Sequence, residues 1–154
     1  MNDTKAEPRK IKILVVDDDP QIRRLIKVTL QSKFNFEIIE AENGAQALLK
    51  IENEKPFLVI LDIMMPELNG IELIEKLKSN EETKDVPVII CSAVNDRSRV
   101  VELFSKGVAD YIVKPINPII LANKITLYIK IYLDKVIKKG PSGEKEGNPE
   151  VSNQ

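Results

Sequence analysis

The chain has 154 residues, of which 43% are hydrophobic, 31% charged and 5% aromatic, with one Cys and no His. A chain of this length fits one domain that buries roughly 68–70% of the surface exposed by the unfolded chain. The lack of His excludes Ser-His-Asp triads, Cys/His zinc sites and imidazole proton transfer, and the net charge of -1 gives no general attraction to nucleic acid or anionic membranes.

Short apolar or β-branched segments alternate along the chain with longer segments of helical periodicity. The predicted strands are residues 11–16, 36–40, 57–61, 88–91 and 111–113. The predicted helices are residues 20–33, 44–54, 70–79, about 96–106 and about 118–138, and the fourth has Val100, Val101 and Phe104 as its apolar positions. This alternation is typical of βα units, and three of the strands are almost continuously apolar, as expected when helices cover both faces of a parallel sheet. The sequence therefore predicts a doubly wound α/β fold.

Polar and small residues mark several helix ends. Asp19 stands before a proline and is interpreted as a helix cap rather than as a metal ligand, and Asn117 repeats this arrangement. Asn69 and Gly70 are interpreted as turn and helix-start residues. Gly107 has the position of a helix C-terminal cap.

The composition changes at both ends of the chain. Residues 1–9 are mostly polar, and residues 140–154 contain three Gly and two Pro, so we predict flexible segments at 1–9 and 139–154, the latter a tail or the start of a linker, around one domain at 10–138. No apolar segment approaches the ~20 residues of a membrane span, and the first residues lack the apolar part of a signal peptide. Because Cys91 is the only cysteine, no internal disulfide can form, and we predict a cytoplasmic protein.

Polar residues follow four of the five predicted strands. Asp17 and Asp18 follow the first, Asp62 the third, Ser92 the fourth and Lys114 the fifth. In a sheet of strand order 2-1-3-4-5 the first and third strands are neighbours at the switch point, where such sheets bind ligands. We therefore expect the three carboxylates to converge at one edge of the sheet.

Converging carboxylates repel one another unless a cation lies among them, and a hard divalent ion with oxygen ligands fits this need. Mg²⁺ is the predicted metal, with Mn²⁺ as an alternative. A carboxylate beside Mg²⁺ is a candidate nucleophile toward phosphorus and would form an acyl phosphate. Lys114 would neutralise charge on the phosphoryl oxygens, and Ser92 would donate a hydrogen bond to one of them.

Four motifs stand in order after the expected strands: ILVVDDDP, LVILDIMMPELNG, the pair Ser92-Ala93, and YIVKP. Together they make residues 10–133 resemble the receiver domain of two-component response regulators. This resemblance implies a flavodoxin-like (βα)5 fold with a five-stranded parallel sheet in the order 2-1-3-4-5. It also implies a phosphoprotein of signal transduction, which catalyses only its own phosphorylation and slow dephosphorylation.

The resemblance assigns roles to the residues of the acidic edge. Asp62 would accept a phosphoryl group from a phosphohistidine on a partner kinase or phosphotransfer protein. Asp18 would bind Mg²⁺ directly, Asp17 through water, and Met64 through its backbone carbonyl.

The same resemblance assigns roles to residues of the last two strands. Lys114 would bind a phosphoryl oxygen, and its bond to Pro115 would be cis. Ser92 would move toward the phosphoryl group, and Tyr111 would report this movement by its rotamer. An aromatic residue on a half-buried strand is also common without any switching role, so that alternative remains for Tyr111.

Three other functional classes fit less well. A phosphatase of the haloacid dehalogenase type also uses an Asp nucleophile and Mg²⁺, but it typically has a second Asp two residues later, where this chain has Met64. A receiver-like scaffold that signals without phosphate would lose some of the acidic residues or Lys114, yet all are retained. A flavin-binding module needs a phosphate-binding loop after the first strand, and here that loop is acidic.

Apolar residues near the site and on the last helix suggest kinetic and binding properties. Met64 and Val94 occupy positions at which polar residues help to place an attacking water, so the phosphate on Asp62 is predicted to be lost slowly. The last helix carries two apolar stripes, one with Leu121, Ile125, Tyr128 and Tyr132 and one with Ile120, Leu127 and Ile131. By the resemblance, the fourth helix, fifth strand and fifth helix form a face for partner binding or homodimerisation. No direct contact with nucleic acid or membrane is expected, and the chain is either a stand-alone receiver or part of a longer regulator.

Overall fold

The structure is a computed structural model in which residues 10–65 and 70–139 are described. The chain divides into two compact units after Ala122. The first unit holds the sheet and the polar residues at its carboxyl edge, and the described part of the second unit is the C-terminal portion of the last helix. The prediction for Asn69 lies outside the described residues.

Five parallel strands form one sheet in the order β2-β1-β3-β4-β5, which confirms the predicted topology. The strands are β1 Lys12–Val16, β2 Glu37–Ala41, β3 Leu58–Leu61, β4 Val88–Ser92 and β5 Asp110–Val113. Strands β1 and β3 are paired from Ile13 with Leu58 to Val16 with Leu61. Their carboxyl ends therefore lie side by side at the switch point of the sheet.

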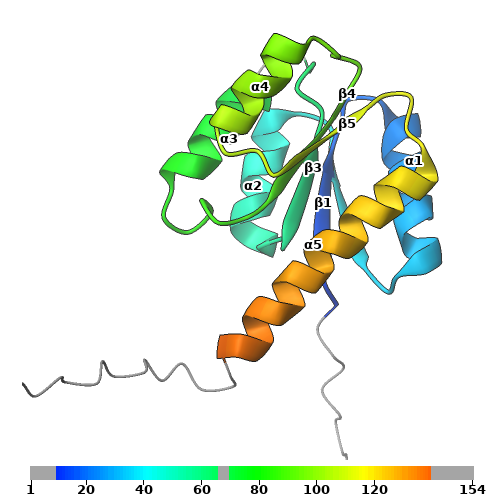
Figure 1. The fold of residues 1–154 in the computed structure, drawn as a ribbon, viewed down its shortest axis with the longest axis vertical. Helices are drawn as coiled ribbons and strands as arrows, with labels where there is room; N and C mark the ends of the chain where they lie inside the picture. Colours follow the sequence, from blue (N-terminus) through cyan, green and yellow to red (C-terminus); the bar gives the residue numbers. More distant parts are fainter. Residues whose placement is uncertain (1–9, 66–69, 140–154) are drawn as a thin grey trace, which may run out of the picture. The chain divides into compact units, whose positions relative to one another are not determined.

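Five helices connect or follow the strands. They are α1 Pro20–Lys33, α2 Gly44–Glu54, α3 Gly70–Ser79, α4 Arg97–Ser105 and α5 Pro118–Lys139. Figure 1 shows α1 on one face of the sheet and α2, α3 and α4 on the other. Strand and helix ends agree with the predicted ones to within one residue. The first turn of α5 belongs to the first unit, and the helix continues into the second.

Apolar side chains cover both faces of the sheet. Leu14 and Val16 belong to the core cluster that includes residues of α2, α3 and α4. Ile13 and Val15 alternate with them along β1, so they point to the opposite face, and they are also completely buried. This double burial explains why the central strands are continuously apolar in sequence.

The predicted helix ends are formed by the expected residues. The Asp19 side chain accepts a hydrogen bond from the Gln21 backbone N–H, with an O···N distance of 2.8 Å, and this confirms Asp19 as a cap. Gly107 follows α4 with φ of 94°, a left-handed conformation that favours glycine at the end of a helix. In α4 itself the buried residue is Leu103, whereas Val101 and Phe104 are exposed.

Gly70 begins α3 at a point where the chain passes very close to the loop after β3. A Cβ added at Gly70 would lie 2.5 Å from the Ile63 Cα, which is closer than any side chain tolerates. Glycine is therefore required here by packing as well as by the turn. The contact fixes the start of α3 against the residue that follows Asp62.

In the second unit, residues 123–139 form a continuous helical segment. Of the first predicted stripe of α5, Leu121 and Ile125 are buried and Tyr132 is 39% exposed. The neighbouring stripe is exposed at Ile120, Leu127 and Ile131. Within residues 10–65 and 70–139, no helix combines the length and apolar character that crossing a bilayer requires.

Candidate functional site

Three chain segments are fixed at the carboxyl edge by backbone hydrogen bonds. The backbone N–H of Asp17 donates to a carbonyl at the end of β2, with an N···O distance of 3.1 Å. The N–H of Asp62 donates to the Val16 carbonyl at 2.9 Å, and that of Lys114 donates to the Ser92 carbonyl at 2.9 Å. These bonds continue the sheet by one residue, so the side chains that follow three different strands meet at one place.

Lys114 links two nearly buried carboxylates. Its Nζ lies 2.7 Å from Oδ2 of Asp17 and 3.0 Å from Oδ2 of Asp62. Asp17 is 2% and Asp62 6% exposed, whereas Asp18 is exposed. The other oxygen of each buried carboxylate accepts a backbone N–H at 2.9 Å, from Asp19 to Asp17 and from Met64 to Asp62. Both carboxylates are thus held in fixed orientations.

Asp17, Asp18 and Asp62 each offer a carboxylate oxygen within 4.8 Å of the others. One lysine cation faces three carboxylates, so the group keeps an excess of negative charge that a divalent cation would neutralise. Carboxylate oxygens, with water completing the shell, are the ligands that Mg²⁺ prefers in proteins. The donor set therefore fits Mg²⁺ and, by the same chemistry, Mn²⁺.

Burial and neighbouring charge shift the pKa values of this group. Burial raises the pKa of the Asp17 carboxyl above its usual value and outweighs the opposing hydrogen bond from Lys114. For Lys114, burial acts to lower the pKa, but the hydrogen bonds and charges of Asp17 and Asp62 raise it. Lys114 is consequently a cation at neutral pH, and the charge on Asp17 is poorly solvated until another cation compensates it.

Ser92 ends β4 with its side chain completely buried. Within the described residues its Oγ forms no hydrogen bond of regular geometry, although the hydroxyl lies close enough to the Tyr111 phenol to act against the rise in the pKa of that group. Buried hydroxyl groups normally have a partner, so this oxygen has an unused capacity to donate and accept hydrogen bonds. Two residues beyond Asp62, Met64 is 61% exposed.

The sequence pattern of the response regulator receiver domain matches residues 13–126. The chain belongs to this family.

Named relatives of this receiver domain include both chemotaxis and transcriptional proteins. The chemotaxis protein CheY homolog of Campylobacter jejuni is 38% identical over 116 residues, which are 75% of this chain and 89% of that protein. The phosphate regulon transcriptional regulatory protein PhoB of Pseudomonas aeruginosa is 37% identical over 139 residues, 90% of this chain and 57% of that protein. The solved chemotaxis response regulator CheY4 of Vibrio cholerae is similar with a TM-score of 0.72 at 27% identity, over 78% of this chain and 99% of that chain.

Tyr111 connects β5 to the loop after β4 in this receiver domain. Its hydroxyl donates a hydrogen bond to the Val94 backbone carbonyl, and burial raises the pKa of the phenol. Val94 lies two residues beyond Ser92, so the tyrosine contacts the segment that joins Ser92 to α4. The Lys114–Pro115 peptide at the end of the same strand is cis.

The thiol of Cys91 lies beside the site but is unreactive. The residue is 1% exposed, and burial raises the pKa of its thiol to about 12. A thiol that remains protonated at neutral pH is a poor nucleophile and metal ligand. Cys91 is therefore a core residue of the receiver domain.

Arg23 stands outside the four motifs of the sequence, yet it contacts the backbone of Asp17 in the acidic group. Its Nη1 donates to the Asp17 backbone carbonyl at an N···O distance of 2.7 Å, and its Nε donates to Oε1 of Glu40 at 3.3 Å. A cation close to a helix N-terminus is disfavoured by the helix dipole. The presence of an arginine near the start of a predicted helix was therefore a sign in the sequence that Arg23 has a specific partner.

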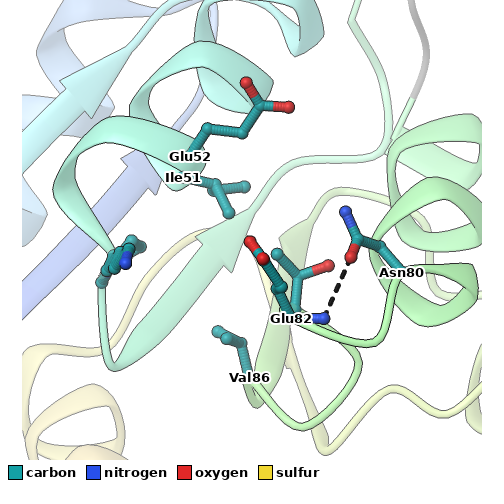
Figure 2. Close-up of a pocket in the computed structure, with 8 residues that line it drawn as sticks. Ile51, Glu52, Asn80, Glu82 and Val86 are labelled. Carbon is teal, nitrogen blue, oxygen red and sulfur yellow. Dashed lines mark hydrogen bonds between the residues drawn. The ribbon is translucent and has the colours of Figure 1, made fainter.

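A separate cavity of about 590 Å³ lies between the C-terminal ends of α2 and α3. Figure 2 shows Ile51 and Val86 among its lining residues and the hydrogen bond from the Glu82 backbone N–H to the Asn80 side chain, at 2.9 Å. Its lining residues come from the helix ends and the loops that lead into β3 and β4, at the amino end of the strands. It shares no residue with the acidic group.

Proposed function

We propose that this receiver domain accepts a phosphoryl group on Asp62 from a phosphohistidine on a partner histidine kinase or phosphotransfer protein. The observation that carries this proposal is the buried Asp62 carboxylate, held by Lys114 beside Asp17 and Asp18. These 154 residues contain no His, so the donor imidazole lies outside them. Residues 10–138 are proposed as the receiver domain, acting in the cytoplasm without direct contact to nucleic acid.

The proposed transfer exchanges one phosphorus bond for another. A carboxylate oxygen of Asp62 forms a bond to phosphorus while the bond from phosphorus to the donor imidazole nitrogen breaks. The electron pair of the broken bond stays on that nitrogen, and a phosphoimidazole protonated on its other nitrogen leaves as neutral imidazole. The product is an acyl phosphate on Asp62.

The surrounding side chains supply charge and hydrogen bonds. The Lys114 ammonium group, which now donates hydrogen bonds to Asp17 and Asp62, would donate one to a phosphoryl oxygen instead. Ser92 would use its unpaired hydroxyl as a second donor. Mg²⁺, held by Asp18, Asp17, Asp62 and the Met64 backbone carbonyl, would supply positive charge against the phosphoryl oxygens.

The acyl phosphate returns to the carboxylate when water attacks phosphorus. Met64 is exposed and apolar, and Val94 is half-buried and apolar, so neither can hydrogen-bond an attacking water. We therefore expect slow dephosphorylation. Met64→Asn and Val94→Glu should each shorten the phosphate lifetime, and unchanged lifetimes in both variants would contradict this explanation.

Phosphorylation would be transmitted to α4 and β5 through Ser92. If Ser92 moves toward the phosphoryl group, the loop between Ser92 and α4 follows, and Tyr111, which is hydrogen-bonded to Val94, changes its position. The outer surface of α4, β5 and the first turn of α5 exposes the apolar residues Val101, Phe104, Val113, Ile119 and Ile120. We propose that this surface binds a partner or a second copy after phosphorylation.

The deciding experiment is incubation with acetyl phosphate and Mg²⁺, followed by intact mass spectrometry of the wild type and Asp62→Asn. We expect one acid-labile phosphoryl group on the wild type and none on the variant. Asp96→Asn is the matched control, because Asp96 is an exposed cap of α4 outside the acidic group, and it should be phosphorylated like the wild type. An unmodified wild type, or a modified Asp62→Asn, would overturn the proposal.

A further inference from the structure

The geometry points to Arg23 as a residue that positions Asp17 and Asp18, the proposed Mg²⁺ ligands. This inference rests on the proposed function of these two aspartates. Arg23 lies on the first turns of α1, and its side chain is only 15% exposed. It reaches back from the helix to the end of β1 through the 2.7 Å hydrogen bond from Nη1 to the Asp17 carbonyl. Its partner Glu40 belongs to β2, so one side chain joins three elements around the acidic edge.

The Asp17 backbone is held on both sides. Its N–H donates to the Ala41 carbonyl at 3.1 Å, and its carbonyl accepts from Arg23. This carbonyl is part of the planar peptide group that joins Asp17 to Asp18. A hydrogen bond that fixes its oxygen therefore also fixes the orientation of the Asp18 backbone N–H and Cα. Arg23 thereby sets the backbone direction of both acidic residues.

Asp18 depends on this backbone support more than Asp17 does. The Asp17 carboxylate is fixed by Lys114 and by the Asp19 N–H, at 2.7 and 2.9 Å. The Asp18 side chain is exposed, and no hydrogen bond to it occurs within the described residues. The position of its carboxylate therefore follows from the peptide plane that Arg23 holds.

The positive charge of Arg23 is partly compensated by the Glu40 carboxylate. Glu40 accepts the Nε–H of Arg23, and its other carboxylate oxygen lies 3.8 Å from Lys27 Nζ. A cation beside the acidic group repels Mg²⁺, whereas a hydrogen bond that positions the metal ligands favours Mg²⁺ binding. The charge of Arg23 and its hydrogen bond should therefore affect the Mg²⁺ affinity in opposite directions. Loss of Arg23 should tighten Mg²⁺ binding if only its charge matters, and weaken it if its hydrogen bond to Asp17 matters.

The test measures metal affinity in the unphosphorylated full chain, using Mn²⁺ detected by electron paramagnetic resonance and competition by Mg²⁺. Arg23→Met should weaken binding by about tenfold, the size typical of a lost outer-shell contact. Arg23→Lys can still donate to the Asp17 carbonyl and should recover part of this loss. Arg24→Met is the control, because Arg24 is exposed and makes no hydrogen bond or ion pair within the described residues, and its affinity should match the wild type.

A second readout separates positioning from general loss of structure. With acetyl phosphate, Arg23→Met should need about tenfold more Mg²⁺ for half-maximal phosphorylation and should reach the wild-type rate at saturating Mg²⁺. Circular dichroism at the assay temperature confirms that each variant is folded. Unchanged or tighter metal binding by Arg23→Met, or an equal loss in Arg24→Met, would overturn the inference alone. A wild type that binds neither Mn²⁺ nor Mg²⁺ would overturn the proposed metal site as well.

Discussion

The carboxyl edge of the sheet and the outer surface of α4 and β5 depart from the usual distribution of side chains in opposite ways. At the edge, Asp17 and Asp62 are 2% and 6% exposed although they carry ionisable groups. On the outer surface, Val101, Phe104 and Val113 are apolar and are 60%, 46% and 46% exposed. Neither arrangement is what folding alone favours, since charges are normally outside and exposed apolar groups gain little.

The difference between the two regions lies in what a substitution should do to stability. Buried charges interact strongly, so changing one of them leaves its neighbours uncompensated. Exposed apolar side chains have few neighbours, so changing them should leave the free energy of unfolding almost intact. Function at the edge is therefore coupled to stability, whereas function on the outer surface is nearly independent of it.

The largest effect is expected for Lys114→Met. This change leaves two nearly buried carboxylates without their shared cation and should lower the free energy of unfolding by about 3 kcal/mol at neutral pH without Mg²⁺. Urea denaturation followed by circular dichroism measures it. Mg²⁺ should restore part of the loss, because it replaces the missing positive charge. Lys130→Met, which changes an exposed lysine, is the control. If both variants lose the same free energy of unfolding, the loss in Lys114→Met does not come from the buried carboxylates.

Asp17→Asn should act in the opposite direction. Because the folded-state pKa of Asp17 is raised above 3.8, its ionisation on folding costs stability at any pH above that raised value. The variant should therefore be more stable than the wild type at neutral pH without Mg²⁺. The gain should shrink as the pH falls through the raised pKa toward 3.8, since the wild-type carboxyl then takes up a proton.

Urea denaturation at several pH values tests this sign. Asp134→Asn, an exposed position on α5, provides the comparison for a carboxylate that folding does not bury. A loss of stability in Asp17→Asn at neutral pH would mean that the hydrogen bond from Lys114 outweighs the cost of burial.

The sequence predicted the parts of this molecule that depend on local patterns and on the rule for parallel sheets. The strand order was foreseen from the resemblance of the four motifs to receiver domains. The meeting of Asp17, Asp62 and Lys114 could then be foreseen because the carboxyl ends of parallel strands share one edge. The capping role of Asp19 could be foreseen because it depends only on the next few residues.

Other features required tertiary contacts. The prediction of Val101 and Phe104 as inward positions of α4 was wrong, because the buried residue is Leu103 and only packing distinguishes it from its apolar neighbours. The contact of Arg23 with the Asp17 carbonyl depends on how α1 lies against the end of β1. Gly70 suggested a turn in the sequence, but its close approach to Ile63 depends on the path of the folded chain.

Ser92→Ala tests whether the unpaired hydroxyl is maintained for function. Removing a buried hydroxyl that has no partner of regular hydrogen-bond geometry should raise the free energy of unfolding by about 1 kcal/mol. Thr83 is the matched control, since it is 9% exposed and its Oγ1 donates to the Leu77 carbonyl at an O···O distance of 2.8 Å. Thr83→Val should lose about 1 kcal/mol instead. Equal losses in both variants would show that Ser92 Oγ is already satisfied in the unphosphorylated protein.

The smallest effect on stability is expected for Phe104→Ser. Phe104 is 46% exposed, so the free energy of unfolding should change by no more than about 0.5 kcal/mol, while the neighbouring Leu103→Ala, at a position 1% exposed, should lose at least about 2 kcal/mol. If the outer surface is a binding face, Phe104→Ser should also abolish any change in molar mass that acetyl phosphate and Mg²⁺ produce in sedimentation experiments. A loss of stability as large as that of Leu103→Ala would place Phe104 in the core, and the contrast between the two regions would then fail because both would be coupled to folding.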